Sequence, residues 1–291
     1  MTKPVQPAIA SDPTVADAAA RAFGDLAAGW FQRGGAAGAD AAPRRELLLR
    51  TLGELGFTDA LPSPQAREHW PDAAILLRAQ ARAALPVDMA LLFATGDRAA
   101  SIGYDTETYA CGHTVPAPAD PAAAAALALG RCLQIGAAMD AALELSLGYV
   151  QERKQFGRPL AQFQAIQHGL AVAAEETAAS TALAELALAR MAREGPDAAT
   201  LPALLDAAAL VASGAVDVVL DVCHQVHGAI GFTREYALHR HSLDLLRWRD
   251  HLLALRGGEL RCAERLGDAA FEAQGLWRAV TASMKPGDTH G

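Results

Sequence analysis

The sequence predicts a mainly all-α protein. Runs rich in alanine and leucine fill the chain, while aromatic residues account for only 5% of it. Ala and Leu favour helices because they lose little side-chain entropy there. Apolar residues also recur at the spacing of one helix face, as Val15, Ala19, Phe23 and Leu26 do near the start of the chain. With 291 residues, 52% of them hydrophobic, the chain can bury a large core in one domain or two.

Residues 1–85 are expected to form a small N-terminal helical region. Apolar periodicity, interrupted by Gly and Pro, marks three helices there, at residues 13–32, 44–56 and 71–84. The pattern changes between residues 86 and 121. Here the apolar stretch Val87–Phe93 and the surroundings of Tyr104 and Tyr109 favour short strands.

Residues 122–276 are expected to form a C-terminal helical bundle, and residues 277–291 a tail. Periodic apolar segments with Gly and Pro breaks predict five helices, at residues 122–152, 162–193, 201–228, 237–254 and 259–276. The first four are long, amphipathic and joined by short connections. This arrangement is typical of a four-helix up-and-down bundle.

Charge and composition exclude several classes of protein. The formal net charge of −8 and the sequence pI of about 5.6 argue against nucleic-acid binding. The most apolar window, residues 121–148, contains Arg131, Asp140 and Glu144, which would be costly in lipid, so no membrane span is expected. The N-terminus lacks the apolar core of a secretion signal, and the four cysteines form no CxxC pair. A cytoplasmic protein with isolated thiols is expected.

A first polar segment joins two of the predicted bundle helices, from Tyr149 to Gln167. The Arg153 guanidinium can form a fork to a phosphate or pyrophosphate. Gln155 and Gln164 supply amide donors and acceptors, and Phe156 offers a flat face to a ring. The alternative is a helix C-terminus whose basic residues interact with the negative end of the helix dipole.

A second segment runs from His224 to Tyr236. Gly228 and Gly231 allow a backbone to approach a ligand closely, and exposed N–H groups in such a turn can bind an anion. The alternative is a helix that stops at Gly228 and continues as a loop. His224 and His227 have a spacing seen in metal sites, but no Glu-x-x-His pair accompanies them, so polar packing and no metal are expected.

Together, the Glu152–Leu160 sequence ERKQFGRPL, the Phe163–Gln167 sequence FQAIQ and the His224–Tyr236 sequence HQVHGAIGFTREY resemble the acyl-CoA dehydrogenase family. The resemblance covers residues 122–266, which correspond to the C-terminal helical domain of that family. It implies an FAD-dependent reaction on an acyl-CoA thioester. A hydride passes from Cβ to FAD while a carboxylate base removes the α-proton, and a trans-2-enoyl-CoA is formed.

The resemblance also implies which residues contact FAD. In the family, an Arg and a Phe of the first motif and a Gln and a Gly of the second contact the FAD of a neighbouring subunit. The matching residues here are Arg153, Gln155, Phe156, Gln164, Gln225, Gly228 and Ala229. Ala229 replaces the second glycine of the family motif. The two motifs are expected to come together in space, and the chain to form a homo-oligomer or a hetero-oligomer.

Two departures from the family pattern concern catalysis. Residues 86–121 are too short for the strand-rich middle domain that holds the flavin ring, so only a remnant or linker is expected. The family base is a Glu either after the last long helix, where this chain has Leu252, or in the first bundle helix, where it has Ala126–Leu129. Asp250 and His251 are the nearest substitutes, because carboxylate and imidazole groups can both accept a proton. The alternative is that both lie at a solvated helix end.

Three hypotheses follow from these observations. The chain is an acyl-CoA dehydrogenase in its own right, or a non-catalytic subunit that completes the FAD site of a full-length acyl-CoA dehydrogenase subunit. The third is a helical interaction protein that has lost flavin binding.

Overall fold

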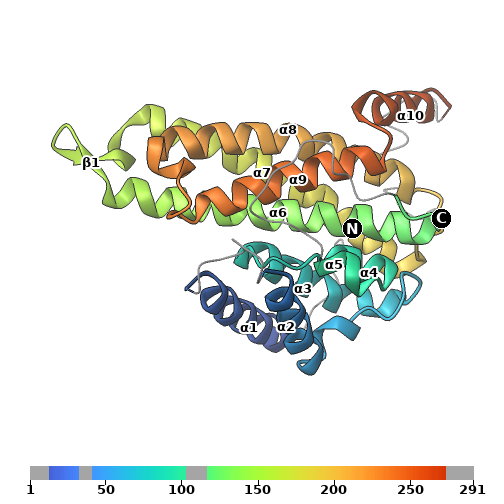
Figure 1. Cartoon of the computed structure of the whole chain (residues 1–291). Coiled ribbons are helices and arrows are strands. Elements are labelled where there is room, and N and C mark those ends of the chain that lie inside the picture. The colour runs from blue at the N-terminus through green and yellow to red at the C-terminus, as the bar shows by residue number, and fades with distance from the viewer. Residues whose placement is uncertain (1–12, 33–40, 103–116, 273–291) are drawn as a thin grey trace, which may run out of the picture.

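The computed structural model describes residues 13–32, 41–102 and 117–272, which are almost entirely helical (Figure 1). This confirms the predicted all-α class. In the N-terminal part, short 3-10 turns connect the α-helices, and the elements are α1 (Pro13–Gln32), α2 (Ala41–Glu54), η1 (Phe57–Asp59), η2 (Arg67–His69), α3 (Trp70–Ala83), α4 (Met89–Thr95) and α5 (Arg98–Ile102).

The predicted strand at Val87–Phe93 is wrong, because this stretch forms α4. Asp88 caps the helix by accepting a hydrogen bond from the Leu91 N–H at 3.0 Å, and Gly96 ends it with a φ of 70°. Every residue from Met89 to Ala94 is buried, so the stretch has no alternating pattern that would separate a strand from a buried helix. Tyr104 and Tyr109 lie outside the described residues.

The C-terminal part contains the predicted four-helix bundle, in which α6, α7, α8 and α9 run side by side (Figure 1). Its elements are α6 (Pro121–Glu152), β1 (Lys154–Gln155), β2 (Arg158–Pro159), η3 (Leu160–Gln162), α7 (Gln164–Glu194), α8 (Leu201–His227), η4 (Gly228–Phe232), α9 (Leu238–Leu255) and α10 (Glu259–Glu272). Helix α10 packs against α8. It is held there by Asp206, which accepts hydrogen bonds from Arg256 and Arg265 at 2.7 Å each.

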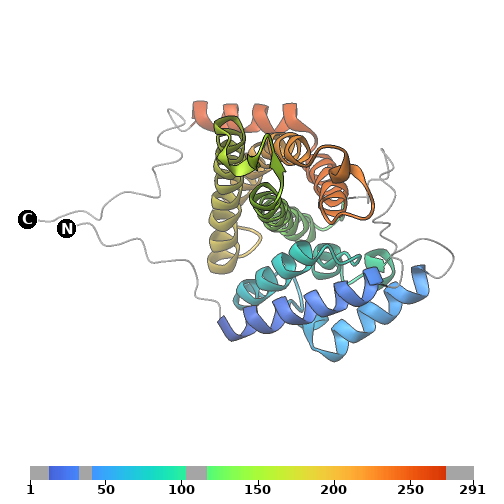
Figure 2. The same cartoon turned by 90° about the vertical axis from the view of Figure 1, so that its left-hand side faces the viewer.

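Helix α6 is the central element of the molecule. It begins at Asp120, whose carboxylate accepts hydrogen bonds from the N–H groups of Ala122 and Ala123, with Pro121 in the first turn. Helices α3 and α4 pack on one side of α6, and α7, α8 and α9 on the other (Figures 1 and 2). By length and composition α6 and α8 could each cross a membrane. In α6, however, 89% of the most apolar window is buried inside the protein, so its apolar surface forms the core.

The close packing of α4 on α6 depends on Gly130. A Cβ atom added there would lie 2.8 Å from the Cβ of Ala90, and neither atom belongs to a flexible side chain.

We therefore expect Gly130→Ala to lower the free energy of unfolding by ~1–3 kcal/mol through overpacking. Urea unfolding checks this, with Gly148→Ala on the same helix as the control. Gly148 is exposed and its added Cβ meets nothing within 4 Å, so that variant should gain up to ~1 kcal/mol. Equal losses in both variants would contradict the packing argument.

Candidate functional site

The first polar segment forms a two-stranded antiparallel hairpin at one end of the bundle (Figure 1). Strands β1 and β2 pair Gln155 with Arg158, and the two residues between them, Phe156 and Gly157, have φ values of 51° and 79°. Two consecutive positive φ values define the tight turn that matches the twist of a two-residue hairpin. Phe163, just before α7, supports the hairpin: the Arg158 guanidinium lies 4.0 Å from its ring centroid, and the Phe156 ring meets it edge-on at 6.3 Å.

Phe156 is an unfavourable residue for this turn. Its side chain is 91% exposed, and its left-handed backbone conformation costs a non-glycine residue ~1–2 kcal/mol. A bulky residue that is both strained and exposed is typical of a functional position.

Because Asn-Gly is the preferred pair in such a turn, Phe156→Asn should raise the free energy of unfolding by ~0.5–1 kcal/mol. Thermal unfolding measures this. Phe156→Leu, which keeps the strained backbone, is the control and should show no gain. A Phe156→Asn variant no more stable than the wild type would contradict a strained turn.

The second polar segment forms the end of α8 and the turn η4. Gly228 ends α8 with φ 62° and ψ −143°, a conformation open essentially to glycine alone, and an added Cβ would meet nothing within 4 Å. Backbone conformation, not space, therefore requires glycine at 228. Gly231 differs, because it is buried and its added Cβ would lie 3.0 Å from the His227 Cβ and 3.2 Å from Leu238 Cδ2. Gly231 serves packing, while Gly228 shapes an exposed turn.

Aromatic contacts tie the two segments together. Tyr149 lies near the end of α6, and His227 is the last residue of α8. Their ring centroids are 4.5 Å apart. His227 is buried, and it donates from Nδ1 to the Cys223 carbonyl at 2.7 Å and accepts at Nε2 from the Tyr236 hydroxyl at 3.1 Å. Burial lowers the pKa of His227, which favours this neutral form. The hairpin and the Gly228 turn thus lie at the same end of the bundle, as expected (Figure 1).

The seven residues proposed to contact a cofactor are all exposed. Four of them have polar side chains, and these side chains form no hydrogen bond or ion pair with any residue that the structure describes: Arg153, Gln155, Gln164 and Gln225. The methyl group of Ala229 lies at the surface too. A guanidinium and several amides held at one end in this way fit an anionic ligand with hydrogen-bonding groups, such as a dinucleotide. All of these side chains face the solvent.

His224 has a structural role. Its Nε2 donates to the Ser242 hydroxyl at 2.7 Å, and its ring stacks on the exposed ring of Phe232 at 4.1 Å. Burial, with smaller effects of His227 and His239, lowers the pKa of His224. Within the described ranges no group of three His, Cys, Asp or Glu side chains could hold a metal ion.

Asp250 and His251 lie in the last turns of α9 in different surroundings. His251 is buried rather than at a solvated helix end, and its Nδ1 accepts a hydrogen bond from Arg131 Nε at 3.0 Å. The proton of a neutral imidazole is then on Nε2, so the ring has no lone pair left with which to accept a proton. Asp250 is partly exposed and accepts a hydrogen bond from Arg249 at 2.9 Å. Leu252, at the expected base position, is buried. Of the three candidate positions, His251 and Leu252 are therefore not arranged as a base, and Asp250 is paired with Arg249.

The sequence alone did not reveal the polar cluster around Arg131. Its guanidinium is 1% exposed and donates to Asp88 Oδ1 at 2.9 Å and to Gln134 Oε1 at 2.7 Å, besides His251. Gln134 in turn donates to Gln80 at 2.6 Å. An Arg in an apolar helix was a signal that a buried partner exists, since buried charges are paired. The partner, 43 residues earlier in the chain, could not be identified without the fold.

The bundle matches a known family of domains. Residues 121–249, which contain the hairpin and the Gly228 turn, match the sequence model of the acyl-CoA dehydrogenase C-terminal domain. Residues 121–249 are an acyl-CoA dehydrogenase C-terminal domain. The chain is 39% identical over 101 residues to acryloyl-CoA reductase (NADH) of Anaerotignum propionicum, covering 35% of this chain and 25% of that protein. It is 33% identical over 99 residues to 3-sulfinopropanoyl-CoA desulfinase of Paraburkholderia xenovorans, covering 34% of this chain and 24% of that protein.

The chain therefore spans about a quarter of the length of these two relatives. A solved structure, the ChsE4-ChsE5 complex from Mycobacterium tuberculosis, aligns with 90% of this chain and 98% of its own chain at a TM-score of 0.63 and 14% identity. At that identity the likeness shows the fold alone. Within the described residues the strands are β1 and β2 alone, so no strand-rich middle domain is present there, as the sequence predicted.

Proposed function

We propose that this chain is a non-catalytic subunit of an acyl-CoA dehydrogenase-type flavoprotein, in which it completes the FAD site of a longer partner chain. One observation carries the proposal: the matching FAD-contact residues are exposed and lie together at one end of the bundle, facing away from this chain's own core. Such residues serve a cofactor held mainly by another chain.

The proposed roles rest on the family resemblance and on the chemistry of each side chain. Arg153 would pair with the pyrophosphate of FAD, the amides of Gln155, Gln164 and Gln225 would orient it, and the Gly228 turn would allow close approach of the backbone. The chemistry that FAD supplies when bound is acceptance of a hydride from the acyl-CoA. The α-proton would be removed by a base of the partner. In this chain His251 already accepts a hydrogen bond from Arg131, and Leu252 stands where the family has the catalytic Glu.

Two features support a hetero-oligomer over a homo-oligomer. A second copy of the chain would again lack both the middle domain and the base at these positions. The fold is also shared with a chain of the ChsE4-ChsE5 complex, an assembly of two different proteins. We place the assembly in the cytoplasm.

The test is an absorption spectrum of the purified chain, alone and co-expressed with full-length acyl-CoA dehydrogenases of the same organism, starting with any that is encoded next to it. The proposal predicts colourless protein alone, yellow protein in the complex, and bleaching of the flavin when an acyl-CoA is added to the complex. Yellow protein alone that bleaches with acyl-CoA would instead establish the second candidate, an independent dehydrogenase. Colourless protein in both preparations would support the third, an interaction protein without flavin.

A further inference from the structure

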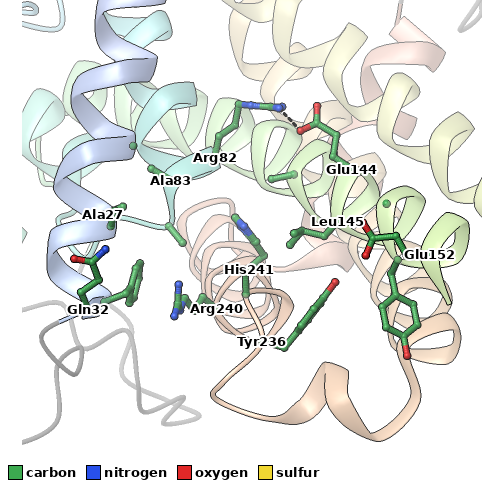
Figure 3. Close-up of a pocket in the computed structure, with 18 residues that line it drawn as sticks. Ala27, Gln32, Arg82, Ala83, Glu144, Leu145, Glu152, Tyr236, Arg240 and His241 are labelled. Carbon is green, nitrogen blue, oxygen red and sulfur yellow. Dashed lines mark hydrogen bonds and ion pairs between the residues drawn. The ribbon is translucent and has the colours of Figure 1, made fainter.

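A groove separate from the flavin-contact residues lies between the N-terminal helices and the bundle. The groove has a volume of about 1060 Å³ and is lined by residues of α1, α3, α6 and α9 (Figure 3). None of the seven flavin-contact residues is among them. Ligand pockets commonly measure about 300–1,000 Å³, so a small organic molecule fits. Alanines of three helices make the walls, which leaves room: Ala27, Ala28, Ala83, Ala84 and Ala141.

One polar side chain in the groove has no partner. His241 points from α9 toward Arg82 and Glu144 (Figure 3) and is only 5% exposed. No described residue forms a hydrogen bond with its ring, and its Nδ1 is fully enclosed. A buried polar group without a hydrogen-bond partner destabilises the folded protein. The other ring nitrogen, Nε2, is not enclosed, so a ligand group in the groove can hydrogen-bond to it.

The charges around His241 indicate the sign of the ligand. Burial, followed by the positive charges of Arg240 and Arg82, lowers the pKa of His241 to about 4, so the ring is neutral at pH 7. Arg82 forms an ion pair with Glu144, and the Arg240 guanidinium lies 3.4 Å from the Phe31 ring centroid. Glu152 lies across the groove from Arg240 (Figure 3). Arg82 and Arg240 are thus the charged groups with the largest effect on His241, and Glu144 is paired with Arg82, so a carboxylate beside His241 would lie between two guanidinium groups.

We propose that this groove binds an amphipathic carboxylic acid. The carboxylate accepts a hydrogen bond from His241 between Arg82 and Arg240, and the apolar body lies along the alanine walls and Leu145. The groove contains none of the seven flavin-contact residues, although Tyr149 and Tyr236, which join the hairpin to the Gly228 turn, line it.

Isothermal titration calorimetry of the full-length chain tests the proposal, with octanoate as the probe and octan-1-ol as the uncharged molecule of the same length. Octanoate should bind the wild type about tenfold or more tightly than octan-1-ol does, since a hydrogen bond to a charged group contributes this much. His241→Leu should weaken octanoate binding about tenfold or more and leave octan-1-ol binding unchanged. The control is His168→Leu, an exposed histidine on α7 outside the groove, which should bind octanoate as the wild type does.

A second variant tests the location without altering His241. Gly148 lines the groove, and its added Cβ meets nothing within 4 Å, so Gly148→Leu fills the groove while improving helix propensity. It should abolish binding of both probes, with circular dichroism confirming that each variant is folded. Undiminished octanoate binding by Gly148→Leu or His241→Leu would overturn the site. So would the absence of octanoate binding to the wild type, and equal affinity for the two probes would overturn the carboxylate assignment.

Discussion

Replacing Asp88 by Ala should lower the free energy of unfolding by ~3–5 kcal/mol, because the guanidinium of Arg131 would remain buried without its counter-charge. The same substitution removes the N-cap of α4. Both side chains of the pair are 1% exposed, so water cannot take the place of the lost carboxylate. Urea unfolding followed by circular dichroism measures the change.

Two further variants identify burial of the charge as the cause. Glu194→Ala removes an ion pair of the same type from the surface, the i,i+4 pair with Arg190, and should change stability by no more than ~0.5 kcal/mol. The double variant Asp88→Leu, Arg131→Met replaces both charges by apolar groups and should recover much of the loss. A double variant as unstable as Asp88→Ala would show that the loss comes from the cap or from packing.

Acid should remove the stabilisation that Asp88 provides. Burial raises the pKa of its carboxyl, but the charge and hydrogen bonds of Arg131, with the Leu91 N–H, outweigh burial and hold the pKa below its ordinary value. The unfolded chain therefore binds this proton more readily than the folded protein. The contribution is complete above a pH of about 4 and is lost as the pH falls below that value. Unfolding free energies measured at several pH values below 5 should decline more steeply for the wild type than for the double variant; equal slopes would contradict the assignment.

Replacing Arg153 by Ala should weaken FAD retention in the complex with the longer partner about 10- to 100-fold, the value of a charge-assisted hydrogen bond pair to a phosphate. Arg153 is exposed and forms no ion pair with any described residue, so the unfolding free energy of the chain itself should not change. Flavin released on dilution of the co-purified complex, followed by fluorescence, measures the effect.

Two neighbouring substitutions serve as controls for Arg153. Lys154→Ala removes the same charge from the same hairpin and should retain flavin nearly as the wild type does. Arg153→Lys keeps the charge but loses the planar fork, and should retain flavin to an intermediate degree. Undiminished retention by Arg153→Ala in a yellow complex would mean that the hairpin does not contact FAD.

The sequence by itself determined the helices and the family. The long periodic segments of the bundle, and stop signals such as Gly195 and Gly228, depend on contacts and backbone preferences within a few residues. The Glu152–Leu160 and His224–Tyr236 motifs identified the family because they are short and local. Where local information was ambiguous the prediction was wrong, as at Val87–Phe93, whose continuous apolar run suits a strand as well as a buried helix.

Only the tertiary structure showed which side chains pair over long distances in the sequence, and which of them are buried. Asp88 and Arg131 are 43 residues apart in the sequence, and Arg131 and His251 are 120 apart. Packing of α4 and α9 against α6 brings the three side chains together. Because the Nδ1 lone pair of His251 accepts the hydrogen bond from Arg131, His251 is not a candidate for the catalytic base. Likewise, the groove at His241 exists only where α1 and α3 meet α6 and α9. Burial and pairing depend on which surfaces meet, and a local pattern does not carry that information.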